Sequence, residues 1–240
     1  HHLRAAIRAE EIAQDRFRLG QVYFEEGKYA LALDQLKQAG RLGHAGGELH
    51  YALAKVYLKL GRVFGAERVV DAPGGRVGTL TEDFLLVERV DEASDRFVAA
   101  PPESAAYQVR RALSLGVQDP EAQLLEAQIW LQGRRYARAA ALYAEVELRM
   151  NAAGWNASQR SEIYAGFADA LFGMDDMEGY LARLKQAWQS EGGWSGRGES
   201  EAMLAKGYRR AALRYLQRGD LENYIRHVEL ALAEAPRDVE

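Results

Sequence analysis

Small and large apolar residues recur along the first seventy residues with a period of 34. Leu19–Tyr23 reads Leu-Gly-Gln-Val-Tyr, and Leu53–Tyr57 reads Leu-Ala-Lys-Val-Tyr. The next matched pairs are Gly27 with Gly61 and Ala32 with Ala66. In a helix hairpin, small residues let two helices approach, and a glycine ends the first helix. The pattern predicts two hairpins in which each tyrosine packs beside a small residue.

Three further copies of this pattern follow between residues 119 and 240, with wider spacing. Small and aromatic residues recur in a similar order around a turn. Their positions are Ala127, Trp130, Tyr136, Ala139 and Tyr143; Phe167, Ala168, Leu171, Leu184 and Ala187; and Tyr208, Ala212, Tyr215, Gly219, Val228 and Ala231. The wider spacing indicates longer helices and loops in these copies.

The segment between these two sets, residues 73–118, matches the pattern poorly. Pro73–Gly75 predicts a loop, and the amphipathic stretch 81–98 predicts a helix that ends before Pro101. Ser104–Leu115 predicts a second helix. We interpret the segment as a loop followed by a degenerate helical hairpin. β-Branched residues number 21 of 240, which is too few to predict strands. The expected total is twelve helices in six pairs.

The order and spacing of these small and large residues resemble the tetratricopeptide repeat (TPR). The resemblance implies an all-α fold, a right-handed α-solenoid of stacked antiparallel helix hairpins with about six pairs, some of them degenerate. Residues 3–72 would form two regular TPR units with an N-terminal helical extension, 73–118 the degenerate part, and 119–240 three TPR-like units with longer helices, all in one continuous solenoid domain. Residues 1–2, both histidine, are interpreted as the remnant of a purification tag.

Composition narrows the class of protein. Hydrophobic residues make up 48% of the chain and charged residues 28%, enough apolar material for a core. No uncharged apolar run approaches the ~20 residues that cross a bilayer, so no membrane insertion is expected. The net charge of -4 disfavours nucleic acid as a partner. The compartment, cytoplasmic or periplasmic, stays open, while an excess of arginine over lysine indicates a bacterial, GC-rich genome.

Candidate catalytic and metal-binding motifs are weak. The absence of cysteine excludes disulfides and thiolate chemistry. His44 and His50 flank a glycine-rich turn without a third close ligand. The acidic run Asp175–Glu178 recurs at Asp220–Glu222 in the same repeat position, so helix capping explains both. Neither a phosphate-binding glycine loop nor a nucleophile elbow is found. We therefore expect no catalytic residue, metal or cofactor.

The TPR resemblance also implies where a partner binds. The first helices of stacked hairpins line a concave groove that holds a peptide or a helix. The groove positions carried over to this chain are Phe17, Gln21, Phe24, Tyr51, Lys55, Leu58, Leu124, Gln128 and Leu131. Their aromatic and apolar side chains are typical of binding hot spots. The expected function is a noncatalytic protein–protein interaction scaffold or adaptor in the assembly of a bacterial complex. The alternative is a regulatory or targeting region of a larger enzyme, and self-association is left open.

A basic helix face is the second candidate surface. It consists of Lys206, Arg209, Arg210, Arg214 and Arg218, most of them four residues apart. The first interpretation is a solvated face that closes the end of the solenoid, because terminal repeats need a polar outer surface. The alternative is a patch that binds an acidic partner.

Overall fold

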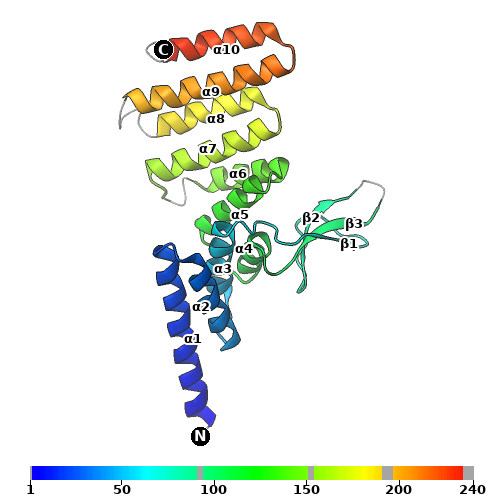
Figure 1. Ribbon diagram of the computed structural model, residues 1–240, viewed down its shortest axis with the longest axis vertical. Helices are drawn as coiled ribbons and strands as arrows, with labels where there is room; N and C mark the ends of the chain where they lie inside the picture. The colour runs from blue at the N-terminus through cyan, green and yellow to red at the C-terminus, as the bar shows by residue number, and fades with distance from the viewer. Residues whose placement is uncertain (1, 91–93, 151–153, 191–196, 235–240) are drawn as a thin grey trace. The chain divides into compact units, whose positions relative to one another are not determined.

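The computed structural model describes residues 2–90, 94–150, 154–190 and 197–234, and in these ranges it contains ten helices and one three-stranded sheet (Figure 1). The helices are α1 His2–Glu25, α2 Tyr29–Arg41, α3 Gly47–Lys59, α4 Ala105–Ser114, α5 Pro120–Gln132, α6 Tyr136–Arg149, α7 Ala157–Gly173, α8 Met177–Ser190, α9 Arg197–Gln217 and α10 Leu221–Glu234. The chain divides into two compact units, His1–Gly133 and Arg134–Glu240. The helical solenoid of hairpins is confirmed.

The first predicted hairpin is formed by α1 and α2. Gly27 has a left-handed backbone with φ of 74°, as a glycine helix end requires. The Lys28 N–H donates to the Tyr23 carbonyl at 2.8 Å and closes the end of α1. Ala32 is fully buried on α2, and Tyr23 is half-buried. The predicted order of small residue, tyrosine, turn glycine and alanine therefore holds in this hairpin.

Gly20 sets the distance between α1 and α2. A Cβ atom on Gly20 would lie 2.8 Å from the Leu36 side chain and 3.3 Å from the Ala32 carbonyl oxygen. We therefore expect Gly20→Leu to overpack the hairpin and lower the free energy of unfolding by about 1–3 kcal/mol in urea denaturation. Ala30→Leu, on the exposed side of α2, is the matched control and should change it little. Equal effects of the two substitutions would contradict this helix register.

The second hairpin is interrupted between its two helices. α3 packs against α4, whereas Ala66, the expected counterpart of the buried α2 alanine, is exposed and outside any helix. The Ala105 N–H donates to the Arg62 carbonyl at 2.9 Å. The Ala106 N–H donates to the Val63 carbonyl at 3.0 Å. The chain thus leaves the hairpin and returns at one place, and the residues between are an insertion.

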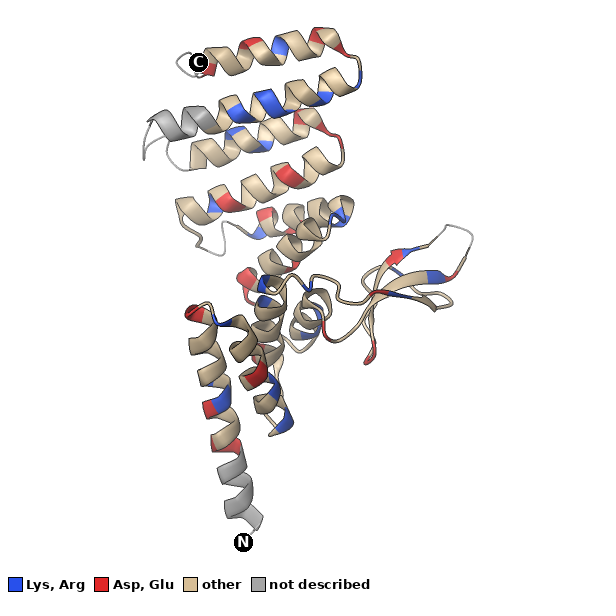
Figure 2. Cartoon of the chain, viewed as in Figure 1, with Lys and Arg blue, Asp and Glu red and all other residues tan. Residues whose placement is uncertain are grey.

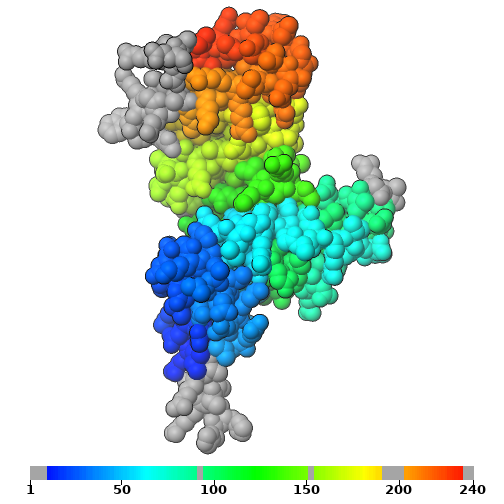
Figure 3. Space-filling view, in the orientation of Figure 1, coloured from blue at the N-terminus to red at the C-terminus, as the bar shows by residue number. Residues whose placement is uncertain are grey.

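The insertion folds as an antiparallel sheet, with β1 Arg68–Asp71, β2 Leu85–Arg89 and β3 Arg96–Ala100 in the order β1-β3-β2. We call residues 66–100 the sheet arm, which projects from the helices of its unit (Figure 3). Leu86, Phe97 and Ala99 form its small core. The Tyr107 hydroxyl of α4 donates to the Glu82 carbonyl at 2.6 Å. This bond ties the arm to the second hairpin.

The helix predicted over 81–98, and the expectation of no strands, are wrong. Leu85, Leu86 and Val87 are all buried, so β2 is a short apolar run buried on both faces instead of one side of an amphipathic helix. This segment is the reason that the described chain has ten helices instead of twelve. The helix expected over Ser104–Leu115 is confirmed as α4, with the Tyr107 N–H donating to Oγ of Ser104 at 3.3 Å.

The C-terminal unit contains α6 and the two hairpins α7–α8 and α9–α10. Its core joins the two hairpins through Ala168, Met177, Tyr180, Leu184, Leu204, Tyr208, Ala211 and Ala231. The predicted capping box is present, with Asn156 and Gln159 each accepting the other's backbone N–H. Asp176 and Asp220 each accept a backbone N–H three residues ahead, at 2.9 and 3.1 Å. The repeated acidic run is therefore a pair of helix caps.

Two further expectations concern the whole chain. Whether the two units continue as one solenoid domain, with the unit boundaries given above, stays a prediction. Within the described ranges, none of the helices is both long enough and apolar enough to cross a membrane.

Candidate functional site

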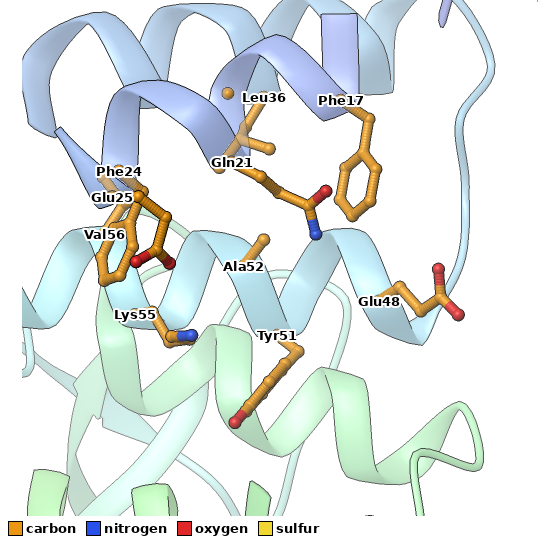
Figure 4. Close-up of a pocket in the computed structure, with 11 residues that line it drawn as sticks. Phe17, Gln21, Phe24, Glu25, Leu36, Glu48, Tyr51, Ala52, Lys55 and Val56 are labelled. Carbon is orange, nitrogen blue, oxygen red and sulfur yellow. The ribbon is translucent and has the colours of Figure 1, made fainter. Parts of the chain in front are cut away.

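A pocket of about 190 Å³ opens between α1 and α3 (Figure 4). Its lining residues are Phe17, Gly20, Gln21, Phe24, Glu25, Leu36, Glu48, Tyr51, Ala52, Lys55 and Val56. α1 and α3 are the first helices of the first two hairpins, so the pocket lies where the TPR resemblance puts the groove. The structure brings five of the predicted groove residues together here: Phe17, Gln21, Phe24, Tyr51 and Lys55.

The floor of the pocket is apolar and well packed. Leu36 and Val56 are buried. Phe17 is only 5% exposed, and its ring stacks on His44 with 4.4 Å between the ring centroids. Gly20 and Ala52 leave the space open because their side chains add little volume. Phe17 is therefore a wall of the pocket more than a free anchor, and its truncation would act largely through packing.

Charged and aromatic groups alternate around the rim. Nζ of Lys55 lies 5.0 Å from the centroid of the Phe24 ring and 5.6 Å from that of Tyr51. At these distances the ammonium group interacts favourably with both rings. In Figure 4 the Glu25 carboxylate points toward the Lys55 side of the pocket, and Glu48 stands at the opposite end. The rim thus combines one cation, two carboxylates and two aromatic rings.

Tyr51 faces the start of α5 as well as the pocket. Burial, and then the charges of Glu121 and Asp119, raise the pKa of Tyr51 to about 12. Burial disfavours the phenolate and the two carboxylates repel it. The Tyr51 hydroxyl therefore stays protonated at neutral pH and can donate a hydrogen bond to a ligand.

The other predicted groove residues lie outside the lining of this pocket. Leu58 is half-buried on α3. Leu124, Gln128 and Leu131 are half-buried on α5, which packs beside α3. Their participation in a longer groove stays a prediction.

Three arginines of the predicted basic face connect α9 to α7 and to the turn that follows α7. Arg210 forms an ion pair with Asp169 at 2.5 Å. Nε of Arg214 lies 3.0 Å from the Asp175 carboxylate, which Arg218 also contacts. Figure 2 shows Lys and Arg positions, in blue, along α9. These contacts support a structural role for the three arginines inside the C-terminal unit.

The Arg210 guanidinium also contacts an aromatic ring of α7. It lies 3.8 Å from the centroid of the Phe172 ring, so it packs on α7 as well as pairing with it. Lys206 and Arg209 are exposed on α9. Arg210 and Arg218 are exposed as well, so an acidic partner would compete with Asp169 and Asp175 for Arg210, Arg214 and Arg218.

A wider cleft of about 890 Å³ lies where the sheet arm joins the second hairpin. The repeat pattern does not predict it, because the insertion creates it. Its lining residues are Gly61, Arg62, Val63, Phe64, Gly65, Ala66, Glu67, Arg68, Asp83, Pro101, Pro102 and Glu103. Five of these twelve residues are charged and Phe64 is the one aromatic residue among them, whereas three aromatic rings line the α1–α3 pocket.

The histidines considered as metal ligands take part in other contacts. His44 stacks on Phe17, and Nδ1 of His50 lies 2.6 Å from Oε1 of Gln108. Across the described ranges, no group of three or more histidine, aspartate, glutamate or cysteine side chains is arranged to hold a metal ion.

Neither a protein-family model nor a curated protein matches the sequence. Several solved structures do match the fold. MamA from Desulfovibrio magneticus RS-1, residues 41 to the end, is 13% identical with a TM-score of 0.58 over 95% of this chain and 97% of that chain. YrrB, described as a TPR protein with an unusual peptide-binding site, is 12% identical with a TM-score of 0.59 over 98% and 93%.

A third match is the Cut9–Hcn1 part of the APC/C, at 13% identity and a TM-score of 0.54 over 95% of this chain and 34% of that chain. Identities this low establish the fold and leave the ligand open. Together with the confirmed helix hairpins and turn glycines, these matches show that the chain has a TPR-like fold.

Proposed function

We propose that this chain is a noncatalytic interaction scaffold that holds a segment of a partner protein in the α1–α3 pocket. The observation that carries the proposal is that five residues at the groove positions implied by the TPR resemblance line this pocket. The YrrB match, whose description names a peptide-binding site, supports a peptide as the ligand. Assembly of a larger complex is the cellular role that we propose for such a scaffold.

The size and lining of the pocket define the ligand. Its volume of about 190 Å³ is below the ~300–1,000 Å³ typical of small-molecule sites. The pocket therefore fits one large apolar side chain of a peptide better than a cofactor. Gln21 and Lys55 on the rim can bind main-chain carbonyl groups of the same peptide. Glu25 and Glu48 disfavour an acidic segment, because like charges brought together reduce affinity.

Filling the pocket tests this function without removing any contact. Ala52→Leu should occupy the space between α1 and α3 and abolish capture of the partner by the full chain. Ala30→Leu makes the same change on the exposed side of α2 and should leave capture intact. Partners are identified by mass spectrometry after affinity capture, and the bound segment is then mapped with overlapping peptides.

Affinity for the mapped segment then separates the two candidate surfaces. Phe24→Ala should weaken binding by about thirtyfold, because truncation of a hot-spot aromatic costs about 2 kcal/mol. The double variant Arg210→Ala/Arg214→Ala should bind normally in isothermal titration. If this double variant loses binding while Phe24→Ala and Ala52→Leu keep it, the site is the basic face and the groove assignment is wrong.

A further inference from the structure

The sheet arm has one covered edge and one open edge. Residues 78–81 lie along the outer side of β2, where the Gly78 N–H donates to the Leu86 carbonyl at 2.7 Å and the Leu86 N–H donates to the Thr79 carbonyl at 2.9 Å. β1 is the strand at the other edge. In the described part of the chain, no backbone segment pairs with the outer side of β1.

The ladder between β1 and β3 shows which groups face outward. The Ala72 N–H donates to the Asp95 carbonyl at 2.8 Å, so these opposed residues belong to a hydrogen-bonded pair. Such pairs alternate along an antiparallel ladder. Val70 therefore points its N–H and C=O toward β3, whereas Val69 and Asp71 point theirs away from the sheet. β1 thus offers two donors and two acceptors to a further strand.

Val69 and Asp71 of β1, with Glu67 just before the strand, place an apolar side chain between two acidic ones, and Arg96 of β3 lies opposite Asp71. Glu67, Val69 and Asp71 alternate with period two, so they share a face, and all three are exposed. Val69 is 51% exposed although its cross-strand neighbour is Val98. A β-branched side chain left open at a sheet edge is a contact point for an added strand.

The sheet arm as a whole also has a negative net charge. Residues 66–100 hold eight acidic and four basic residues, which equals the full net charge of -4 of the chain. The remainder of the molecule is balanced. Figure 2 shows acidic segments at several places along the arm. Basic residues that flank a strand paired with β1 would therefore be attracted by the net negative charge of the arm.

A second copy of this chain fits the open edge poorly. If two β1 strands pair antiparallel about Val69, Glu67 of one copy lies opposite Asp71 of the other, and the like charges repel. If they pair about Val70, Val69 lies opposite Asp71 and the apolar contact is lost. The alternating acidic and apolar side chains thus disfavour pairing between two copies of β1. Charged residues on edge strands commonly prevent such self-pairing.

We propose that β1 accepts an extended segment of a partner protein by strand addition, and that this segment places a β-branched residue opposite Val69 with lysine or arginine two positions to either side. Main-chain hydrogen bonds to Val69 and Asp71 supply the binding, and the basic residues pair with Glu67 and Asp71. This site is distinct from the α1–α3 pocket and does not depend on it.

The probe is the synthetic peptide acetyl-Gly-Lys-Thr-Val-Thr-Lys-Gly-amide, added to the full chain and followed by NMR with amide hydrogen exchange. At saturation, exchange of the Val69 and Asp71 amides should slow by about tenfold or more, because they gain hydrogen-bond partners. The Val70 and Ala72 amides, already bonded to β3, should change little. The charge-reversed peptide, with glutamate in place of both lysines, should bind at least about tenfold more weakly.

Two substitutions test the contact separately. Val69→Pro removes the outward N–H while leaving the ladder to β3 intact, since proline is tolerated where the N–H of an edge strand faces solvent. Asp71→Lys reverses one charge and keeps the backbone. Each should weaken the basic peptide by about tenfold, and Asp71→Lys should also strengthen binding of the charge-reversed peptide. Glu229→Lys, an equal charge change on α10, is the control and should bind like the parent chain.

Three results would overturn the proposal. The first is no saturable binding of the basic peptide up to millimolar concentration. The second is binding that Asp71→Lys leaves unchanged, or that protects amides other than those of Val69 and Asp71. The third is a concentration-dependent dimer in sedimentation that Val69→Pro abolishes, which would make a second copy the occupant.

Discussion

Phe64→Ala is expected to lower the free energy of unfolding of the N-terminal unit by about 3–5 kcal/mol, the range for deleting a buried aromatic ring. Phe64 belongs to the insertion and is only 7% exposed. Its ring meets Trp130 of α5 edge-on, with 5.4 Å between the centroids. The substitution would leave a cavity beside Trp130 at the point where the insertion leaves the second hairpin.

Gly133 provides an internal test of this packing. A Cβ atom on Gly133 would lie 2.1 Å from Cε2 of Phe64, so Gly133→Ala should by itself destabilise the unit by about 1–3 kcal/mol. In the Phe64→Ala background the ring is gone and the same change should be almost neutral. The double variant should therefore be clearly more stable than the sum of the two single effects predicts.

Urea denaturation followed by circular dichroism and tryptophan fluorescence measures the four states of this cycle. Gly46→Ala is the matched control, because Gly46 has an extended backbone with φ of 176° and no atom within 4 Å of the position that an added methyl group would take. Because Gly46 is the N-cap of α3, where glycine is preferred over alanine, this substitution should cost up to about 1 kcal/mol. Strict additivity of the Phe64 and Gly133 substitutions would show that the two residues do not share this contact.

The same glycine shows why the third repeat is hard to align by sequence. In the third repeat, Gly133 lies one position before the place where the repeat pattern predicts the turn glycine. In the structure Gly133 has φ of -76° and the left-handed residue is Arg134, with φ of 59°. Gly133 is therefore needed for the approach of Phe64 and not for the turn. Sequence reasoning cannot find this, because Phe64 comes from an insertion that the repeat pattern does not contain.

The regular part of the fold is predictable because it depends on local spacing. Gly27 and Gly61 both have left-handed backbones, as predicted from the 34-residue period. The match of Ala32 with Ala66 is the exception, since only Ala32 lies on a helix. The chain inserts the sheet arm after the second turn glycine, and the period continues there by coincidence.

The sheet arm had a compositional signal that an average over the whole chain conceals. Six of the fourteen valines and both threonines lie in residues 66–100. β-Branched residues are therefore concentrated in the one segment that forms strands. Counted in a local window, they would have favoured strands over the helix predicted for 81–98.

The candidate pocket was predictable for the same local reason as the hairpins. All of its lining residues except Leu36 come from α1 and α3, whose first-helix positions the period aligns. The pairing of Arg214 and Arg218 with Asp175 was not predictable, because Asp175 lies about forty residues earlier in the sequence, in the turn after α7. The backbone of Asp175 is left-handed there, with φ of 71°. A row of arginines with helical spacing looks alike whether it faces solvent or a neighbouring helix.

Alkaline pH is expected to destabilise the protein strongly, because burial raises the pKa of several tyrosines. They are Tyr51, Tyr57, Tyr107, Tyr143, Tyr180 and Tyr215. A tyrosine titrates near pH 10 in an unfolded chain. A pKa raised in the folded state contributes stability that is fully present below pH ~10 and is lost as the pH rises through the folded value. For Tyr51 the loss should extend to about pH 12.

Tyr143 should contribute most to this loss, because it is only 1% exposed and its hydroxyl lies against the α7 backbone at Gly166. Burial is the main cause that raises the pKa of Tyr143, followed by the charges of Glu162 and Asp169. Melting temperatures measured from pH 8 to 12 should fall above pH ~10, and less steeply in Tyr143→Phe, which has no hydroxyl to ionise. Tyr29→Phe, at a half-buried position, is the control and should follow the parent curve. If the folded parent chain shows full tyrosinate absorbance near pH 10 without losing helicity, burial does not restrain these hydroxyl groups and the prediction is wrong.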